Sequence, residues 1–73
     1  MSKPFAVRIT VAMSDGSTAT QPYVRSERSS QGREVFTSMA LGRMLRMLSD
    51  WDDTRGLGVT GWSIVEIDPA TVA

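Results

Sequence analysis

The 73-residue sequence contains no histidine and no cysteine, and its one lysine is Lys3. Without cysteine the chain has no disulfide, no zinc thiolate site, no iron–sulfur cluster and no thiol nucleophile. Without histidine it has no imidazole base, no imidazole metal ligand and no Ser-His-Asp triad. We therefore expect a protein that is not an enzyme and that uses no metal and no cofactor.

Long apolar runs are missing as well. No stretch of 18 apolar residues is present, so we expect no transmembrane helix, and the first residues lack the apolar segment of a signal peptide. The hydrophobic fraction is 41% and the charged fraction 22%, both near the averages of globular proteins. We expect one small domain over residues 1–73, located in the cytoplasm and without a membrane partner.

Residues 5–13 predict the clearest strand. Apolar side chains alternate there with period two, which places them on one face of a sheet: Phe5, Val7, Ile9, Val11 and Met13. Asp15 and Gly16 follow, a pair that accepts the backbone of a hairpin turn. Residues 18–24 then predict the returning strand, at an edge of the sheet because Pro22 cannot donate a hydrogen bond to a neighbour.

Residues 33–51 have the periodicity of a helix, with Ser29 or Ser30 as its expected N-cap. One apolar stripe is expected to face the sheet: Phe36, Ala40, Met44, Met47, Leu48 and Trp51. Leu41 and Leu45 widen this stripe beyond what one small sheet needs. Either the sheet wraps around the helix, or a partner covers Leu41 and Leu45, which makes them a candidate oligomer face.

Residues 59–67 predict a third strand, in which Gly61 marks a bulge, and residues 68–73 predict a frayed tail. The element order β-β-α-β predicts an α+β fold. A strand that follows a returning helix pairs best antiparallel to the first strand, which gives a three-stranded antiparallel sheet of order 2-1-3 with the helix on one face. We expect Trp51 and Trp62 to close the two ends of the core.

The net charge of zero divides into two opposite halves. Residues 1–47 carry seven cationic and three acidic side chains, a net charge of +4, whereas residues 48–73 carry one and five, a net charge of −4. Arginine supplies seven of the eight cations, and arginine is common at binding surfaces. This pattern predicts a chain with two electrically different ends.

The acidic half starts where the helix should end, with Asp50, Asp52 and Asp53. Acids are unfavourable there because the C-terminus of a helix is the negative end of its dipole. Two explanations remain open. Either the helix stops early and Ser49 caps a short new turn, in which acids are favourable, or the cluster is retained as a surface for a partner.

The cations of the first half supply a second candidate surface, formed by five arginines: Arg25, Arg28, Arg33, Arg43 and Arg46. Together they would suit phosphate groups. The sequence pI of about 6.1 argues against tight binding of nucleic acid, so a nucleic acid is not the expected partner.

One glycine pattern resembles a dinucleotide-binding motif. Residues 56–61 match G-x-G-x-x-G letter for letter. That motif works where a strand turns into a helix whose N-terminus meets the pyrophosphate. Here the expected helix precedes the glycines and the expected strand follows them, so the pattern predicts a loop and no nucleotide cofactor.

In length, neutrality and β-β-α-β order, the chain resembles the small phage-encoded anti-CRISPR proteins, several of which are single domains with a short antiparallel sheet and one helix. The resemblance implies a protein–protein inhibitor whose partner is a Cas protein or another host defence complex. Its acidic cluster would then compete with DNA or guide RNA. Two alternatives remain: a nucleic-acid-binding accessory protein that uses the arginines, or a small structural phage protein that forms a homodimer through Leu41 and Leu45 or through the Pro22 strand.

Overall fold

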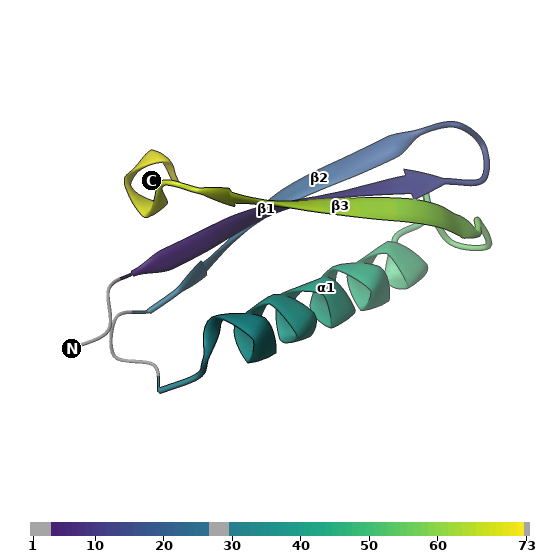
Figure 1. Ribbon diagram of the computed structural model, residues 1–73. Helices are drawn as coiled ribbons and strands as arrows, with labels where there is room; N and C mark the ends of the chain where they lie inside the picture. Colours follow the sequence, from purple (N-terminus) through teal and green to yellow (C-terminus); the bar gives the residue numbers. More distant parts are fainter. Residues whose placement is uncertain (1–3, 27–29, 73) are drawn as a thin grey trace.

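The computed structural model describes residues 4–26 and 30–72, which form an elongated α+β domain of 42 × 20 × 18 Å (Figure 1). Its elements in chain order are β1 (Phe5–Met13), β2 (Thr18–Arg25), α1 (Arg33–Asp50), β3 (Val59–Ile67) and the short 3-10 helix η1 (Pro69–Thr71). None of the helices in the described part of the chain is both long and apolar enough to cross a lipid bilayer.

The three strands form one antiparallel sheet in the order β2-β1-β3, as the sequence predicts. A central rung shows the register, since Thr10 of β1 pairs with Thr20 of β2 and with Ser63 of β3. The β1–β3 register shifts between Ala12 and Met13. The residue left over by this shift is Thr60, directly before Gly61, so the expected bulge lies one residue earlier than predicted.

A tight turn joins β1 and β2. Gly16 has a φ of +88°, a left-handed conformation that glycine adopts without a steric penalty. The backbone N–H of Met13 donates to the carbonyl of Ser17 at 2.9 Å, and the N–H of Gly16 donates to the carbonyl of Met13 at 3.0 Å. The predicted Asp-Gly turn is therefore present, and it sits beside the segment that leads into β3.

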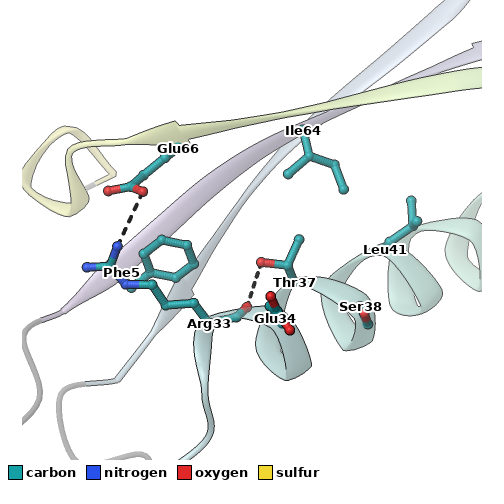
Figure 2. Close-up of a pocket in the computed structure, with 8 residues that line it drawn as sticks. All are labelled: Phe5, Arg33, Glu34, Thr37, Ser38, Leu41, Ile64 and Glu66. Atoms are coloured by element: carbon teal, nitrogen blue, oxygen red, sulfur yellow. Dashed lines mark hydrogen bonds and ion pairs between the residues drawn. The ribbon is translucent and has the colours of Figure 1, made fainter.

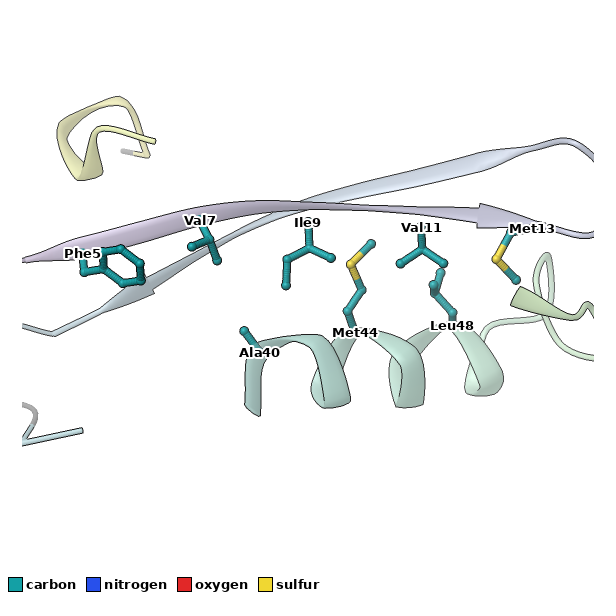
Figure 3. Packing of buried hydrophobic residues seen from close by; sticks show 8 residues of the cluster. All are labelled: Phe5, Val7, Ile9, Val11, Met13, Ala40, Met44 and Leu48. Atoms are coloured by element: carbon teal, nitrogen blue, oxygen red, sulfur yellow. The ribbon is translucent and has the colours of Figure 1, made fainter. Parts of the chain in front are cut away.

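The core lies between one face of β1 and α1 (Figure 3). The alternating residues of β1 all point toward the helix, and three helix residues one turn apart point back. These residues form one buried cluster: Phe5, Val7, Ile9, Val11, Met13, Ala40, Met44 and Leu48. The members from β1 are two residues apart, as in a strand, and the members from α1 are four residues apart, as in a helix. The sequence pattern predicts both spacings.

The helix covers the sheet unevenly. It packs against β1 and β2, and the buried apolar residues include none from β3. An α-helix is about 10 Å wide, whereas strands lie about 4.8 Å apart, so one helix covers about two strands. Trp62 of β3 is consequently 55% exposed, and Trp51, which follows the last turn of α1, is 45% exposed. The prediction that both tryptophans close the core was wrong. Periodicity gives the direction in which a side chain points, but it does not show how far the opposing element extends to cover that side chain.

The helix begins without a side-chain cap. Its N-cap is Gly32, whose extended backbone (φ −67°, ψ 161°) leads into the first turn. Ser30 precedes it and is not the cap, and Ser29, the other predicted cap, lies outside the described residues. The N–H of Phe36 donates to the carbonyl of Gly32 at 3.0 Å, so the backbone alone closes this end.

The helix ends at Asp50, one residue before the predicted end. Trp51 is its C-cap, and the N–H of Trp51 donates to the carbonyl of Met47 at 3.1 Å. Ser49 lies inside the last turn, where its hydroxyl donates to the carbonyl of Arg46 at 2.7 Å. Ser49 therefore does not cap a new turn, and the first explanation for the acidic cluster was wrong.

The end of the chain is ordered over η1 rather than frayed. Asp68 is the N-cap of η1, and its carboxylate accepts a hydrogen bond from the N–H of Ala70 at 3.0 Å. Pro69 occupies the first helical position, where a missing N–H costs nothing. The expectation of a frayed tail was thus wrong for residues 69–71. Asp68 and Pro69 form a helix-capping motif that the sequence analysis did not recognise.

Replacing Met44 by alanine tests the core. Met44 is fully buried at the centre of the helix stripe, and we expect M44A to lower the free energy of unfolding by about 2–5 kcal/mol, since it removes buried methylenes and leaves a cavity. The control V35A, at an exposed helix position, should change it by about 0.5 kcal/mol or less. Urea denaturation measures both. Equal effects of the two variants would contradict this core.

Candidate functional site

Four carboxylates gather at one end of the molecule. Asp50 ends α1, Asp52 and Asp53 lie in the turn that follows, and Asp15 lies in the β1–β2 turn. Asp15 and Asp53 line the same hollow. With Arg55 as the one cation of this turn, the five charged residues give a net charge of −3. We call Asp15, Asp50, Asp52 and Asp53, together with Trp51, the acidic end.

Trp51 occupies the middle of the acidic end. It lines the hollow of about 460 Å³ that it shares with Asp15 and Asp53, and it also lines an adjoining hollow with Asp50 and Asp52. Its indole is 45% exposed. A large, half-exposed aromatic side chain within a charged rim is the arrangement found at energetically dominant points of protein interfaces. The negative rim suits a basic protein surface.

Hydrogen bonds join the end of α1 to the turn that follows it. The N–H of Arg55 donates to the carbonyl of Trp51 at 2.7 Å, and the N–H of Thr54 donates to the same carbonyl at 3.2 Å. The hydroxyl of Thr54 donates to the carbonyl of Leu48. The guanidinium of Arg55 lies 2.8 Å from a carboxylate oxygen of Asp52. The helix end and the turn therefore form one hydrogen-bonded unit.

This arrangement has an electrostatic cost. The last turn of α1 contains no basic residue, so the C-terminal carbonyls of the helix face acids instead of cations. An acid in the last turn costs about 0.3–1 kcal/mol. Natural proteins commonly carry side chains that lower their stability, so this cost alone assigns no role to the cluster. The second explanation for the cluster, a surface for a partner, stays open.

The sequence analysis missed Asp15 as part of this surface. Asp15 lies 35 positions before Asp50, and only the hairpin brings the two acids to the same end. Its carboxylate accepts the hydroxyl of Ser17 at 2.5 Å and the N–H of Ser17 at 2.9 Å. These hydrogen bonds, the side-chain one first, hold the pKa of Asp15 below its ordinary value. The charge of Asp15 therefore persists to lower pH.

The structure describes four members of the predicted arginine surface, and one of them, Arg25, is not available at the surface. Arg25 is 6% exposed: its guanidinium donates to the carbonyl of Gln31 at 2.9 Å and lies 5.5 Å from the centre of the Phe5 ring. Arg43 and Arg46 are exposed on α1, and Arg28 lies outside the described residues. Arg25 thus has a structural role that its position in a polar connector did not indicate.

Folding also separates the acidic residues that lie together in the second half of the sequence. Strand β3 carries Glu66 back to the start of α1, where it lies 3.6 Å from the guanidinium of Arg33, and Asp68 follows it. The acidic half of the sequence is therefore split between both ends of the molecule. Among the described residues, Asp15, Asp50, Asp52 and Asp53 lie together at one end, whereas Glu66 and Asp68 lie at the other.

A second surface lies between α1 and β3, and we call it the α1–β3 groove (Figure 2). Leu41 of the helix and Ile64 of the strand point toward one another across it, and Phe5 forms its inner wall. The Arg33–Glu66 pair closes one end. Its volume is about 450 Å³. This groove exists because the helix leaves β3 uncovered.

Leu41 and Leu45, the predicted oligomer face, are partly buried and pack against the core. The sheet therefore covers part of each side chain, and Leu41 also lines the α1–β3 groove. The packing of both side chains against the core accounts for part of the wide apolar stripe, and the expectation that a partner covers them stays a prediction.

The carboxylates of the acidic end do not converge on one point. Within residues 4–26 and 30–72, no three acidic side chains lie together in an arrangement that could hold a metal ion. Comparison of the chain with protein families, with curated proteins and with solved structures gives no match. The function is therefore argued from the two surfaces themselves.

Replacing Ser17 by alanine tests the electrostatics of the acidic end. We expect S17A to raise the pKa of Asp15 toward its ordinary value, because the hydroxyl that stabilises the carboxylate is lost. The pKa of Asp15 is lower in the folded chain than in the unfolded chain, so the ionised carboxylate stabilises the fold. This stabilisation is present above the unfolded pKa and is lost as the pH falls through the folded pKa. A carboxyl NMR titration measures the shift, with T18A as the control. An unchanged Asp15 pKa in S17A would contradict this arrangement.

Proposed function

We propose that the protein is a non-enzymatic inhibitor that binds a larger protein through its acidic end. The half-exposed Trp51 within its rim of carboxylates carries the proposal, because it joins an apolar anchor to concentrated negative charge. The indole supplies contact area at a low cost in entropy, and the carboxylates attract a basic surface over a longer range.

The acidic end suits a protein surface that otherwise binds nucleic acid. Such surfaces place lysine and arginine where they meet phosphates, and carboxylates on a rigid turn offer the same sign of charge. The resemblance in size and element order to anti-CRISPR proteins supports this direction. The target we propose is accordingly a Cas protein or another host defence complex, blocked in the bacterial cytoplasm by a protein that a phage or mobile element encodes.

Nucleic acid itself is a less suitable partner. The acidic end would repel phosphates, and Arg25 is buried while Arg33 pairs with Glu66. Arg43 and Arg46 are exposed on one flank of α1 and offer two phosphate contacts there. The arrangement of charges therefore favours a protein partner.

Two charge reversals on the same helix test the proposal. The protein would be expressed in bacteria that carry active CRISPR–Cas systems of different types, and the plaquing of a targeted phage would be measured. We expect the wild-type chain to restore plaquing on at least one system and D50K to lose most of this effect. D50K replaces an acid at the negative end of the helix dipole, so the variant should be about 0.3–1 kcal/mol more stable.

E34K is the matched control, because it makes the same charge reversal in the first turn of α1, where an acid is favourable. E34K should be less stable than the wild type and should still inhibit. Loss of inhibition in the more stable variant cannot come from unfolding. Inhibition that D50K retains would contradict a role for the acidic end, and the absence of inhibition in every CRISPR–Cas system would contradict a Cas protein as the target.

A further inference from the structure

We propose that two copies of this chain pair through their β3 strands, which would close both α1–β3 grooves and form a continuous six-stranded sheet. This inference concerns the side of the molecule away from the acidic end and does not depend on the proposed function. The starting observation is that β3 is an edge strand of nine residues whose helix side is not buried.

The two edges of the sheet differ in how well they are protected. The β2 edge carries Pro22, which lacks the N–H that a further strand would need, and it ends in the buried Arg25. Strand β3 contains no proline, and its one charged residue, Glu66, already pairs with Arg33. A long edge strand without proline or free charge is a site for pairing with another strand. The open edge is therefore β3.

The sequence of β3 is compatible with itself in the antiparallel direction. Pairing of the whole strand with a second copy places the two-fold axis at its middle residue, Ser63. Trp62 then lies opposite Ile64 of the second copy, an aromatic and β-branched combination that stabilises antiparallel strands. Glu66 lies opposite Thr60, so no like charges face each other. Each contact occurs twice, as a two-fold interface requires.

The space between the two helices fits the side chains that are left uncovered. In each copy α1 lies over β1 and β2, so the two helix axes would be separated by roughly four strand spacings, about 19 Å. Helices in direct contact lie about 8–10 Å apart. The remaining width corresponds to one layer of side chains, which Trp62 and Ile64 of both copies can fill, with Leu41 at its border.

Charge and exposure agree with a second copy. Antiparallel pairing places the two acidic ends, each with a net charge of −3, at opposite ends of the dimer, where they do not repel. Strand β3 presents nine residues along this edge, seven of them exposed, so pairing would cover a continuous line of accessible residues. Both acidic ends remain free, so the dimer would present two of them.

The absence of cysteine makes this interface directly testable. Ser63 and Thr20 belong to the same rung on opposite edges of the sheet, and both side chains are exposed. In S63C the two thiols would face each other across the two-fold axis, at a separation that a disulfide spans. We expect S63C to form a disulfide-linked dimer rapidly under mild oxidation and T20C, the matched control, to remain largely monomeric.

Sedimentation of the wild-type chain from about 1 μM to 1 mM, a range that covers the affinities of most specific assemblies, should show a monomer–dimer equilibrium. I64K should weaken the dimer at least tenfold, whereas V24K, on the exposed β2 edge, should leave it unchanged; circular dichroism checks that both variants fold. A wild-type chain that stays monomeric, or cross-linking of T20C as fast as S63C, would overturn the proposal. Both results would leave the function of the acidic end untouched.

Discussion

The packing of one face of β1 on α1 is the interaction on which the rest of the structure depends. Five apolar side chains of β1 and three of α1 form the buried cluster, and the other two strands add backbone hydrogen bonds but few buried side chains. A chain of this size buries only a moderate part of its surface, so one helix stabilises one strand well and leaves a neighbour exposed. Both proposed surfaces follow from this limit.

The acidic end follows from where this core stops. Leu48 is the last buried residue of the helix, and the next five residues, 49–53, are all exposed. Asp50, Trp51 and Asp53 therefore occupy positions that the core does not need, and a hydrogen-bonded turn keeps them in place. At the other side of the molecule, the helix does not cover β3, and the side chains of Trp62 and Ile64 are exposed. One protein thus carries an acidic surface and an apolar one, separated by its core.

Local patterns predicted most of the fold. The strict alternation in residues 5–13 and the Asp-Gly turn gave β1 and its hairpin, and the α+β class and sheet order followed from the antiparallel return of each element. Long-range placement was not predictable. The sequence does not show that Asp15 joins Asp53, that Arg25 turns inward onto Phe5, or that the helix is too narrow to reach Trp62. Each of these depends on distances between elements, on which periodicity carries no information.

Amide hydrogen exchange, followed as a function of protein concentration, tests this division of the molecule most directly. If β1 and α1 hold the core and β3 is an edge that a second copy covers, the amides of β1 exchange slowest at every concentration, and the outward amides of β3 become more protected as concentration rises. Amides of β2 should not change. Protection of β3 that equals that of β1 at low concentration, or that does not respond to concentration, would contradict the account.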